Sequence, residues 1–373
     1  MDVSDVRAAV DPERPLDLLV IGAGPTGLAI GAAAIQAGLE VAVLDRGGLC
    51  DGIRQYPTDL QFFTTRERLE IAGVPFAIPD AKPNRKQALA YYREVARHWR
   101  VPLVLHQTVT NVRRAGDGFE VTRLRSGANG NGNATERRWR AGAVALASGY
   151  FGKPIRLGVP GEDLPWVSSR YREAYGHFGD RVVVVGAGNT AAEAALELYR
   201  WGAQVTVIHR GAAFRPGVKY WLKPDLENRI AEGSIPALMH TTVEAFVDGH
   251  SVSSPMAVEV RTPEGRRSIP ADAAYVLIGY LPELELARQV GVTLEPETLI
   301  PRVDPETCES DVPGFFIAGT IQAGKFTNRI FIENSRDHGP RIVACLARRR
   351  GDDAVAGELL AAVGPAGREA LLD

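Results

Sequence analysis

The clearest chemical signal in this 373-residue chain comes from three glycines near its N-terminus, spaced as G-x-G-x-x-G: Gly22, Gly24 and Gly27. They follow the apolar run 18–21, which is typical of a buried parallel strand, and precede the alanine-rich stretch 28–37, which predicts a helix. In this context the glycines allow a tight turn, a close approach of a pyrophosphate to the backbone, and close packing of helix against strand. The N-terminus of the helix offers unpaired N–H groups to phosphate, and we expect Pro25 and Thr26 to line the same site.

An acidic residue follows the second strand that the sequence predicts. The run 41–44 is apolar, and Asp45 and Arg46 come directly after it. A carboxylate at this position can accept hydrogen bonds from the ribose hydroxyls of a dinucleotide. A glycine pattern alone could be an ordinary tight turn, but the strand, the helix and the acid together favour a nucleotide site.

The same arrangement occurs again in the middle of the chain. Four valines at 182–185 lead into a second glycine turn and a second alanine-rich stretch, and the residues of this turn are Gly186, Gly188, Asn189 and Thr190. The step from Gly22 to Asp45, taken from Gly186, ends at His209, which is followed by Arg210. A carboxylate repels a 2′-phosphate and arginine attracts one, so the second site is predicted to bind NADPH. Arg215 is a further candidate for this phosphate.

Glycine also follows three other short apolar strands, in the sequences Ser148-Gly149, Gly279 and Gly319-Thr320. Ligands of an open α/β sheet lie beyond the carboxyl ends of its strands, where glycine lets the backbone approach a bound cofactor. The segment 56–65 is rich in aromatic and hydroxyl side chains, among them Tyr56 and Phe63. These side chains could pack against a flat ring, or they could close the end of the sheet, and the sequence leaves both alternatives open.

Length and composition suit about two domains of an ordinary globular protein. The formal net charge of −2 gives no indication of a nucleic-acid or membrane-surface partner. No apolar run approaches the ~20 residues of a membrane helix, and the polar start of the chain does not resemble a secretory signal. We therefore expect a cytoplasmic protein.

The three cysteines Cys50, Cys308 and Cys345 are far apart, and no C-x-x-C pair occurs. This spacing excludes a local redox-active dithiol and the usual cysteine zinc sites, so no metal site is predicted. We expect inert, packed thiols rather than nucleophiles. The periodicity predicts helices over 85–100, with Tyr91 on the solvated face, and over 331–350, and it predicts a hairpin tip at 126–133.

Proline-containing segments on either side of the second glycine unit, at 154–165 and at Pro282, indicate two crossings between domains. We infer that the second nucleotide domain is inserted into the first. The predicted boundaries are 1–153 and 283–373 for the first domain and its tail, and 154–282 for the inserted domain.

Two fingerprints with three glycine-ended strands resemble the flavoproteins with two dinucleotide-binding domains, which include thioredoxin reductase and flavin monooxygenases. The chain is more closely similar to the bacillithiol disulfide reductase family. The segments that carry this resemblance are Tyr56-Pro57-Thr58, Phe62-Phe63, Val74-Pro75-Phe76, Lys82-Pro83, residues 87–95, and Ile330-Phe331-Ile332-Glu333-Asn334. The resemblance implies an α/β fold with two Rossmann-like, doubly wound, three-layer domains, of which the NADPH domain is inserted into the FAD domain.

The resemblance also implies roles for individual residues. The FAD contacts would be Gly22, Gly24, Gly27, Asp45 and Val109, with Gly319 and Thr320 beside the ribityl chain. The NADPH contacts would be Gly188, Asn189, Thr190, His209, Arg210 and Arg215. Members of the family commonly carry a cysteine in the first glycine loop, where this chain has Thr26, and wider relatives have aspartate where it has Thr320.

The function implied is transfer of hydride from NADPH to FAD and then to a low-molecular-weight disulfide such as bacillithiol disulfide. One alternative is reduction of ferredoxin, flavodoxin or another non-disulfide acceptor, and another is a non-catalytic flavin-bound redox sensor. Expected partners are a small disulfide or a redox carrier protein, and other copies of the chain in a homo-oligomer. We name no side chain as catalytic, although Glu333 and His338 are candidates for proton transfer near the flavin or for structural contacts at a helix start.

Overall fold

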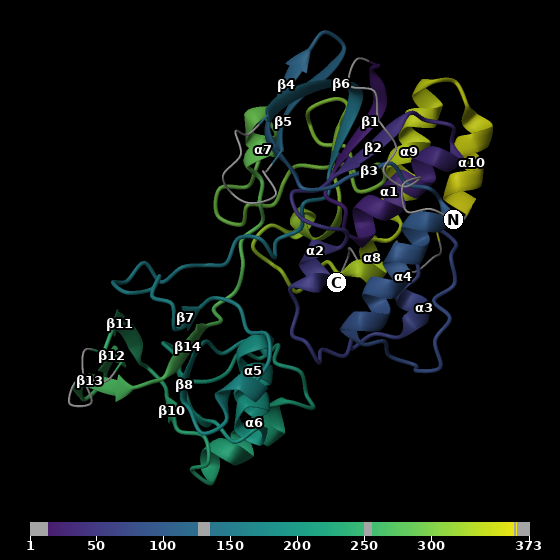
Figure 1. Cartoon of the computed structure of the whole chain (residues 1–373). Helices are drawn as coiled ribbons and strands as arrows, with labels where there is room; N and C mark the ends of the chain where they lie inside the picture. The colour runs from purple at the N-terminus through teal and green to yellow at the C-terminus, as the bar shows by residue number, and fades with distance from the viewer. Residues whose placement is uncertain (1–13, 126–134, 250–255, 362, 364–373) are drawn as a thin grey trace. The chain divides into compact units, whose positions relative to one another are not determined.

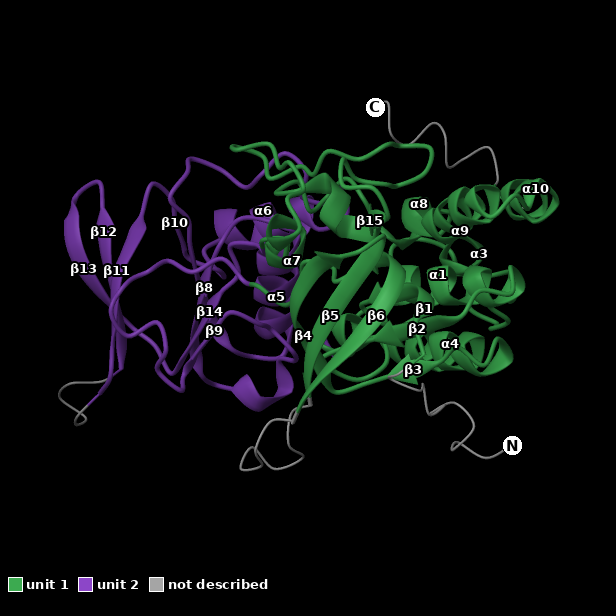
Figure 2. Ribbon diagram, turned by 90° about the horizontal axis from the view of Figure 1, so that it is seen from above, with its two compact units in different colours: residues 1–55, 60–153, 281–373 green, residues 56–59, 154–280 purple. Residues whose placement is uncertain are grey.

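The structure is a computed structural model that describes residues 14–125, 135–249, 256–361 and 363. The expected hairpin tip at 126–133 lies outside these residues. The chain divides into two compact units (Figure 2): unit 1 comprises Met1–Gln55, Leu60–Lys153 and Leu281–Asp373, and unit 2 comprises Tyr56–Asp59 and Pro154–Tyr280. Each unit is built around a sheet with parallel central strands and with helices packed on it, which confirms the α/β class (Figure 1).

Unit 1 contains a sheet of order β3-β2-β1-β6-β5-β4, with β15 paired to β6. Its strands are β1 (Leu16–Ile21), β2 (Val41–Leu44), β3 (Leu103–Val104), β4 (Gln107–Ala115), β5 (Gly118–Arg125), β6 (Thr135–Leu146) and β15 (Phe315–Ile317). The strands β3, β2, β1, β6 and β15 run parallel, whereas β4, β5 and β6 form an antiparallel meander. The register pairs Ile21 with both Leu44 and Leu146, and Leu146 with Ile317. The carboxyl ends of four strands are therefore level at one edge.

Helices cover this sheet because their apolar faces pack onto it. The described helices of unit 1 are α1 (Pro25–Gln36), α2 (Asp51–Arg54), α3 (Arg66–Leu69), α4 (Arg85–His98), α7 (Glu285–Gln289), α8 (Ile332–Ser335), α9 (His338–Arg349) and α10 (Asp353–Ala361), with the 3-10 turn η3 (Gly319–Ala323). The helix expected over 331–350 is interrupted: α8 ends at Ser335 and α9 begins at His338, with Arg336 and Asp337 in a turn between them. Tyr91 was expected on the solvated face of α4, but it is buried, and its hydroxyl donates to Val74 C=O (2.7 Å).

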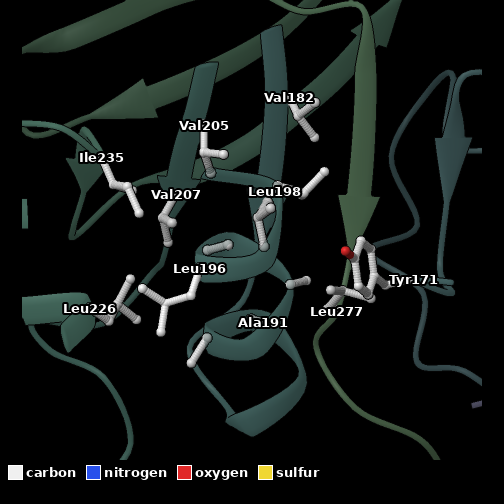
Figure 3. Close-up of a cluster of buried hydrophobic side chains, with 14 of the residues drawn as sticks. Tyr171, Val182, Ala191, Leu196, Leu198, Val205, Val207, Leu226, Ile235 and Leu277 are labelled. Carbon is white, nitrogen blue, oxygen red and sulfur yellow. The ribbon is translucent and has the colours of Figure 1, made fainter. Parts of the chain in front are cut away.

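Unit 2 repeats the strand–turn–helix arrangement. Its parallel sheet has the order β10-β9-β8-β14-β7, formed by β7 (Val167–Ser168), β8 (Arg181–Val185), β9 (Gln204–Ile208), β10 (Ala237–Leu238) and β14 (Ala273–Val276). A second, antiparallel sheet contains β11 (Thr242–Val247), β12 (Ala257–Thr262) and β13 (Gly265–Pro270). The remaining elements are α5 (Asn189–Arg200), α6 (Lys223–Ala231) and the 3-10 turn η2 (Tyr175–His177). Leu196 and Leu198 of α5 pack against Val205 and Val207 of β9 (Figure 3).

Within the described part of the chain, no helix combines the length and the apolar composition that crossing a bilayer requires.

The packing of α9 against α1 depends on Gly339. A β-carbon at this position would lie 2.6 Å from the backbone oxygen of Ala29 in α1. We therefore expect Gly339→Ala to force the two helices apart and to lower the free energy of unfolding by about 1–3 kcal/mol. Urea unfolding followed by circular dichroism measures this change.

Gly357→Ala is the matched control, because Gly357 of α10 has no atom within 4 Å of the added methyl. The control should instead be stabilised by about 0.5–1 kcal/mol. Equal stability of the two variants would contradict the close approach.

Candidate functional site

The first glycine turn joins β1 to α1 through backbone contacts that exclude side chains. Gly22 has φ +115°, and a β-carbon there would lie 2.3 Å from Ala147 O. A β-carbon at Gly27 would lie 1.8 Å from Gly22 O. Gly24 is the N-cap of α1, and a β-carbon there would have no protein atom within 4 Å. No side chain caps the helix. The first N–H groups of a helix have no intrahelical partner, so this turn leaves donors and room for a pyrophosphate.

Asp45 lies at the end of β2, beside this turn. Its carboxylate accepts hydrogen bonds from the N–H groups of Ala23 and Gly47, both at 2.7 Å. Burial of Asp45 raises the pKa of its carboxyl above the usual value, although these two hydrogen bonds oppose the shift. Each carboxylate oxygen has a second lone pair, which leaves acceptor capacity for ribose hydroxyls. Val109 lies in β4, and the first residue of that strand, Gln107, donates its N–H to Asp45 C=O (2.9 Å).

Arg46 is engaged within the protein. Its guanidinium forms a bidentate ion pair with Glu283, with both N···O distances at 2.8 Å. Ser148, at the end of β6, donates through Oγ to Glu283 O (3.3 Å). The structure thus places Arg46 and Ser148, both expected cofactor contacts, around the same glutamate.

The other expected FAD residues meet where β6 and β15 end. A β-carbon at Gly149 would lie 3.9 Å from Thr320 Oγ1, and one at Gly319 would lie 3.0 Å from Thr26 Oγ1. The N–H of Gly319 donates to Nδ1 of His338 at 3.0 Å. Residues from α1, β6, η3 and α9 therefore converge on one edge of the sheet.

Two titratable groups in this part of the chain, His338 and Glu333, have shifted pKa values. Burial lowers the pKa of His338 to about 4, with a smaller contribution from the charge of Arg341, so the imidazole is neutral near pH 7. Because Nδ1 accepts from Gly319, the proton of the neutral ring is on Nε2. Burial also raises the pKa of Glu333 above its usual value. The sequence analysis did not identify Ser335, whose Oγ lies 3.2 Å from Thr26 Oγ1. No pattern in the sequence distinguishes this serine.

The aromatic segment divides between the two units. Phe62 is buried, whereas Phe63 is 40% exposed and packs edge-to-face on Phe331, with ring centroids 5.6 Å apart. Tyr56 belongs to unit 2, where the neighbouring Thr58 N–H donates to Arg172 C=O (2.7 Å). The contact of Tyr56 with FAD stays a prediction.

The three thiols have the environment of structural cysteines. Cys50 and Cys308 are buried, and burial raises the pKa of both thiols, that of Cys308 to about 12. Cys345 is half-buried, and burial raises its pKa also. A thiolate is the reactive form, so none of them has the environment of a nucleophile, as the sequence analysis expected.

Unit 2 contains the second glycine turn, between β8 and α5. Gly186 has φ +144°, and a β-carbon there would lie 2.4 Å from Leu277 O. Gly188, the N-cap of α5, again has open space and no side-chain cap. Thr190 lies in the first turn of α5, and Gly279, with φ +112°, follows β14. The side chain of Asn189 forms hydrogen bonds within the protein: it donates to Gly217 O (3.1 Å) and accepts from Lys219 N (2.9 Å).

Three basic residues gather near this turn. His209 and Arg210 follow β9, and Arg215 N donates to Ala187 O (3.0 Å) inside the turn. The pKa of His209 is lowered by burial and, to a smaller extent, by the charges of Arg215 and Arg210. Among the residues that the structure describes, none of these three forms an ion pair with a carboxylate. This unneutralised positive charge suits a phosphate monoester.

A fold with two such turns defines the class of two-domain dinucleotide-binding oxidoreductases. A family model, "Pyridine nucleotide-disulphide oxidoreductase", matches residues 19–319, and the chain belongs to this family. Enzymes of this family use FAD and NADPH.

Individual relatives agree with this assignment. Bacilliredoxin reductase Bdr of Bacillus subtilis is 35% identical over 89% of this chain and 97% of its own length. The structure of the bacillithiol disulfide reductase Bdr from Bacillus cereus has a TM-score of 0.83 and 33% identity, with 90% of this chain and all of that chain covered. A ferredoxin–NADP reductase of Ignicoccus hospitalis is 28% identical over 82% of this chain and 90% of its own length.

The open position at Gly24 gives a direct test of the first turn. We expect Gly24→Ala to weaken FAD binding about tenfold or more, because the methyl group takes the space through which a pyrophosphate approaches the backbone. The unfolding temperature should not change, since the methyl meets no protein atom within 4 Å. Quenching of FAD fluorescence by apoprotein measures the affinity, and Gly357→Ala is the control. Unchanged FAD affinity in Gly24→Ala would be evidence against this site.

Proposed function

We propose that the chain is an FAD-dependent oxidoreductase that uses NADPH to reduce a low-molecular-weight disulfide of the bacillithiol disulfide type. The observation that carries the proposal is a difference in charge after two otherwise similar glycine turns. Asp45 follows the first turn, and His209, Arg210 and Arg215 surround the second. A carboxylate suits the free ribose hydroxyls of FAD, whereas arginine suits the 2′-phosphate of NADPH. Unit 1 would therefore hold FAD and unit 2 would hold NADPH.

The residues of unit 1 would bind and orient, and none would form a covalent bond. When bound, the nicotinamide and the flavin supply two-electron hydride chemistry, with one NADPH and one proton consumed for each disulfide reduced to two thiols. The N-terminal N–H groups of α1 would bind the pyrophosphate, and Asp45 would bind a ribose. Gly319 and Thr320 would lie beside the ribityl chain. Glu333, whose pKa burial raises, is the candidate to supply a proton at its carboxyl oxygen.

The residues of unit 2 would select the nucleotide. The backbone of α5 from Asn189 onward would bind the pyrophosphate, and the side chain of Asn189 would hold the 217–219 loop in place. The guanidinium groups of Arg210 and Arg215 would bind the 2′-phosphate through charge-assisted hydrogen bonds. His209 is kept neutral by its surroundings, and it becomes a better proton acceptor when a phosphate offsets the charge of the arginines.

One observation favours a second candidate, the reduction of a non-disulfide acceptor such as ferredoxin or flavodoxin. Thr26 cannot attack a disulfide in place of a thiolate, and Cys50, Cys308 and Cys345 all have raised pKa values. The ferredoxin–NADP reductase of Ignicoccus hospitalis is among the relatives. In the proposed disulfide reaction, electrons would have to reach the substrate without a mixed disulfide on the protein.

Removing one arginine tests the choice of nucleotide. We expect Arg210→Ala to raise the KM for NADPH about tenfold or more, because a charge-assisted hydrogen bond to the 2′-phosphate is lost, and to leave the KM for NADH nearly unchanged. Steady-state kinetics with both nucleotides measure the effect. Arg200→Ala is the matched control, since Arg200 is also exposed in unit 2 and pairs with Asp225 (2.6 Å). An equal rise for NADPH and NADH would refute the phosphate contact.

The choice of acceptor is tested by oxidation of NADPH in the presence of bacillithiol disulfide, ferredoxin, flavodoxin or a quinone. We expect the disulfide to give the highest kcat/KM. Prior treatment with iodoacetamide should leave the rate unchanged, since no thiol of the chain takes part. In Thr26→Cys the same treatment should inactivate, because a thiol at the N-terminus of α1 has a lowered pKa. Turnover with ferredoxin or flavodoxin and none with the disulfide would establish the second candidate instead.

A further inference from the structure

The segment that contains α8 and the start of α9 contacts two turns that are expected to bind FAD. These are the glycine turn with Thr26 and the turn at Gly319. Ser335, the last residue of α8, lies 3.2 Å from the hydroxyl of Thr26 in α1. His338, the first residue of α9, accepts the N–H of Gly319 at 3.0 Å. Both contacts lie within unit 1. They give a physical role to the segment that begins with the distinctive sequence 330–334, for which the fold alone provides no reason.

The direction of the hydrogen bonds follows from the chemistry of the groups. A hydroxyl has one proton, and Ser335 Oγ lies 2.6 Å from Phe331 C=O, which can only accept. The proton of Ser335 is therefore used in that bond. In the contact between the two hydroxyls, Thr26 must donate and Ser335 must accept. The Thr26 oxygen is left with lone pairs and no free proton.

The surroundings keep this arrangement in place. Ser335 is only 1% exposed, so no solvent competes for its hydroxyl. Thr26 lies against the Gly319 turn, where even a β-carbon on the glycine would be 3.0 Å from Thr26 Oγ1. The N–H of that glycine is already bonded to His338 and cannot donate to Thr26.

We propose that Ser335 is a positioning residue, which fixes the hydroxyl of Thr26 so that position 26 presents a hydrogen-bond acceptor and no donor to bound FAD. This inference rests on the proposed binding of FAD in unit 1. The proposal predicts that the FAD atom facing the Thr26 hydroxyl belongs to a hydrogen-bond donor, an N–H or O–H group. The carbonyl of Phe331 contributes to this arrangement, because it accepts the proton of Ser335 and so fixes the orientation of that hydroxyl.

A double-mutant cycle tests the coupling between the two residues. The variants are Thr26→Val, Ser335→Ala and the combination of both, and the readouts are the dissociation constant for FAD and the absorbance spectrum of the bound flavin. We expect each single change to weaken FAD binding about three- to tenfold, the range for loss of one hydrogen bond. The double variant should be no weaker than Thr26→Val, because Ser335 acts only through Thr26. Thr26→Ser keeps the hydroxyl and should bind FAD like the wild type.

Ser310→Ala is the matched control for loss of a buried serine. Ser310 also lies in unit 1 and donates to a backbone carbonyl, Phe315 C=O, at 2.7 Å, but it does not contact either turn. It should change the unfolding temperature without changing the FAD affinity or the flavin spectrum. Additive effects of Thr26→Val and Ser335→Ala, or a Ser335→Ala variant that loses stability alone, would overturn the positioning role. Failure of the wild-type chain to bind FAD would instead contradict the proposed function.

Discussion

The constraint on which the rest of the structure depends is the near-contact of backbone with backbone at the glycine turn after β1. The carbonyl of Ala147 occupies the place of a side chain at Gly22, and the carbonyl of Gly22 occupies the place of one at Gly27. These contacts set the start of α1 directly against the sheet. The unpaired N–H groups of the helix then point beyond the carboxyl ends of the parallel strands, where a phosphate can reach them. Unit 2 reproduces the arrangement with Gly186 against Leu277.

In the proposed function, charge is what distinguishes the ligands of the two similar turns. The acid after β2 accepts from one backbone N–H of the glycine turn, that of Ala23, and from one of its own loop, that of Gly47, so its position is fixed before any ligand arrives. Among the basic residues after β9, the pKa of His209 is lowered first by burial and then by the charges of Arg215 and Arg210, so like charges there repel one another. A phosphate placed among them would relieve that repulsion, and this gain would add to the hydrogen bonds that it forms. The same scaffold can thus hold two dinucleotides and discriminate between them by the groups beyond the second strand.

Sequence reasoning succeeded where the signal is local. The glycine spacing, the apolar strands and the residues directly after them lie within short stretches, and the family and the fold class followed from them. It did not find contacts between residues remote in sequence. Thr26 and Ser335 are 309 positions apart, and Arg46 and Glu283 are 237 apart, so only the folded chain brings them together. The prediction that Tyr91 lies on a solvated helix face was wrong for the same reason. Its hydroxyl donates to the carbonyl of Val74 in a loop, and helical periodicity does not reveal that contact. Asn189 was located correctly at the helix start, but the neighbouring loop binds its side chain.

In the proposed function, hydride passes from NADPH to FAD, and Cys50, Cys308 and Cys345, whose thiol pKa values are raised by burial, take no part. The most direct measurement is therefore an anaerobic titration of the FAD-loaded protein with NADPH and, separately, with NADH, followed by flavin absorbance. We expect NADPH to bleach the flavin stoichiometrically and NADH to do so only at much higher concentration. A flavin that neither nucleotide bleaches, or one that both bleach at the same concentration, would contradict it.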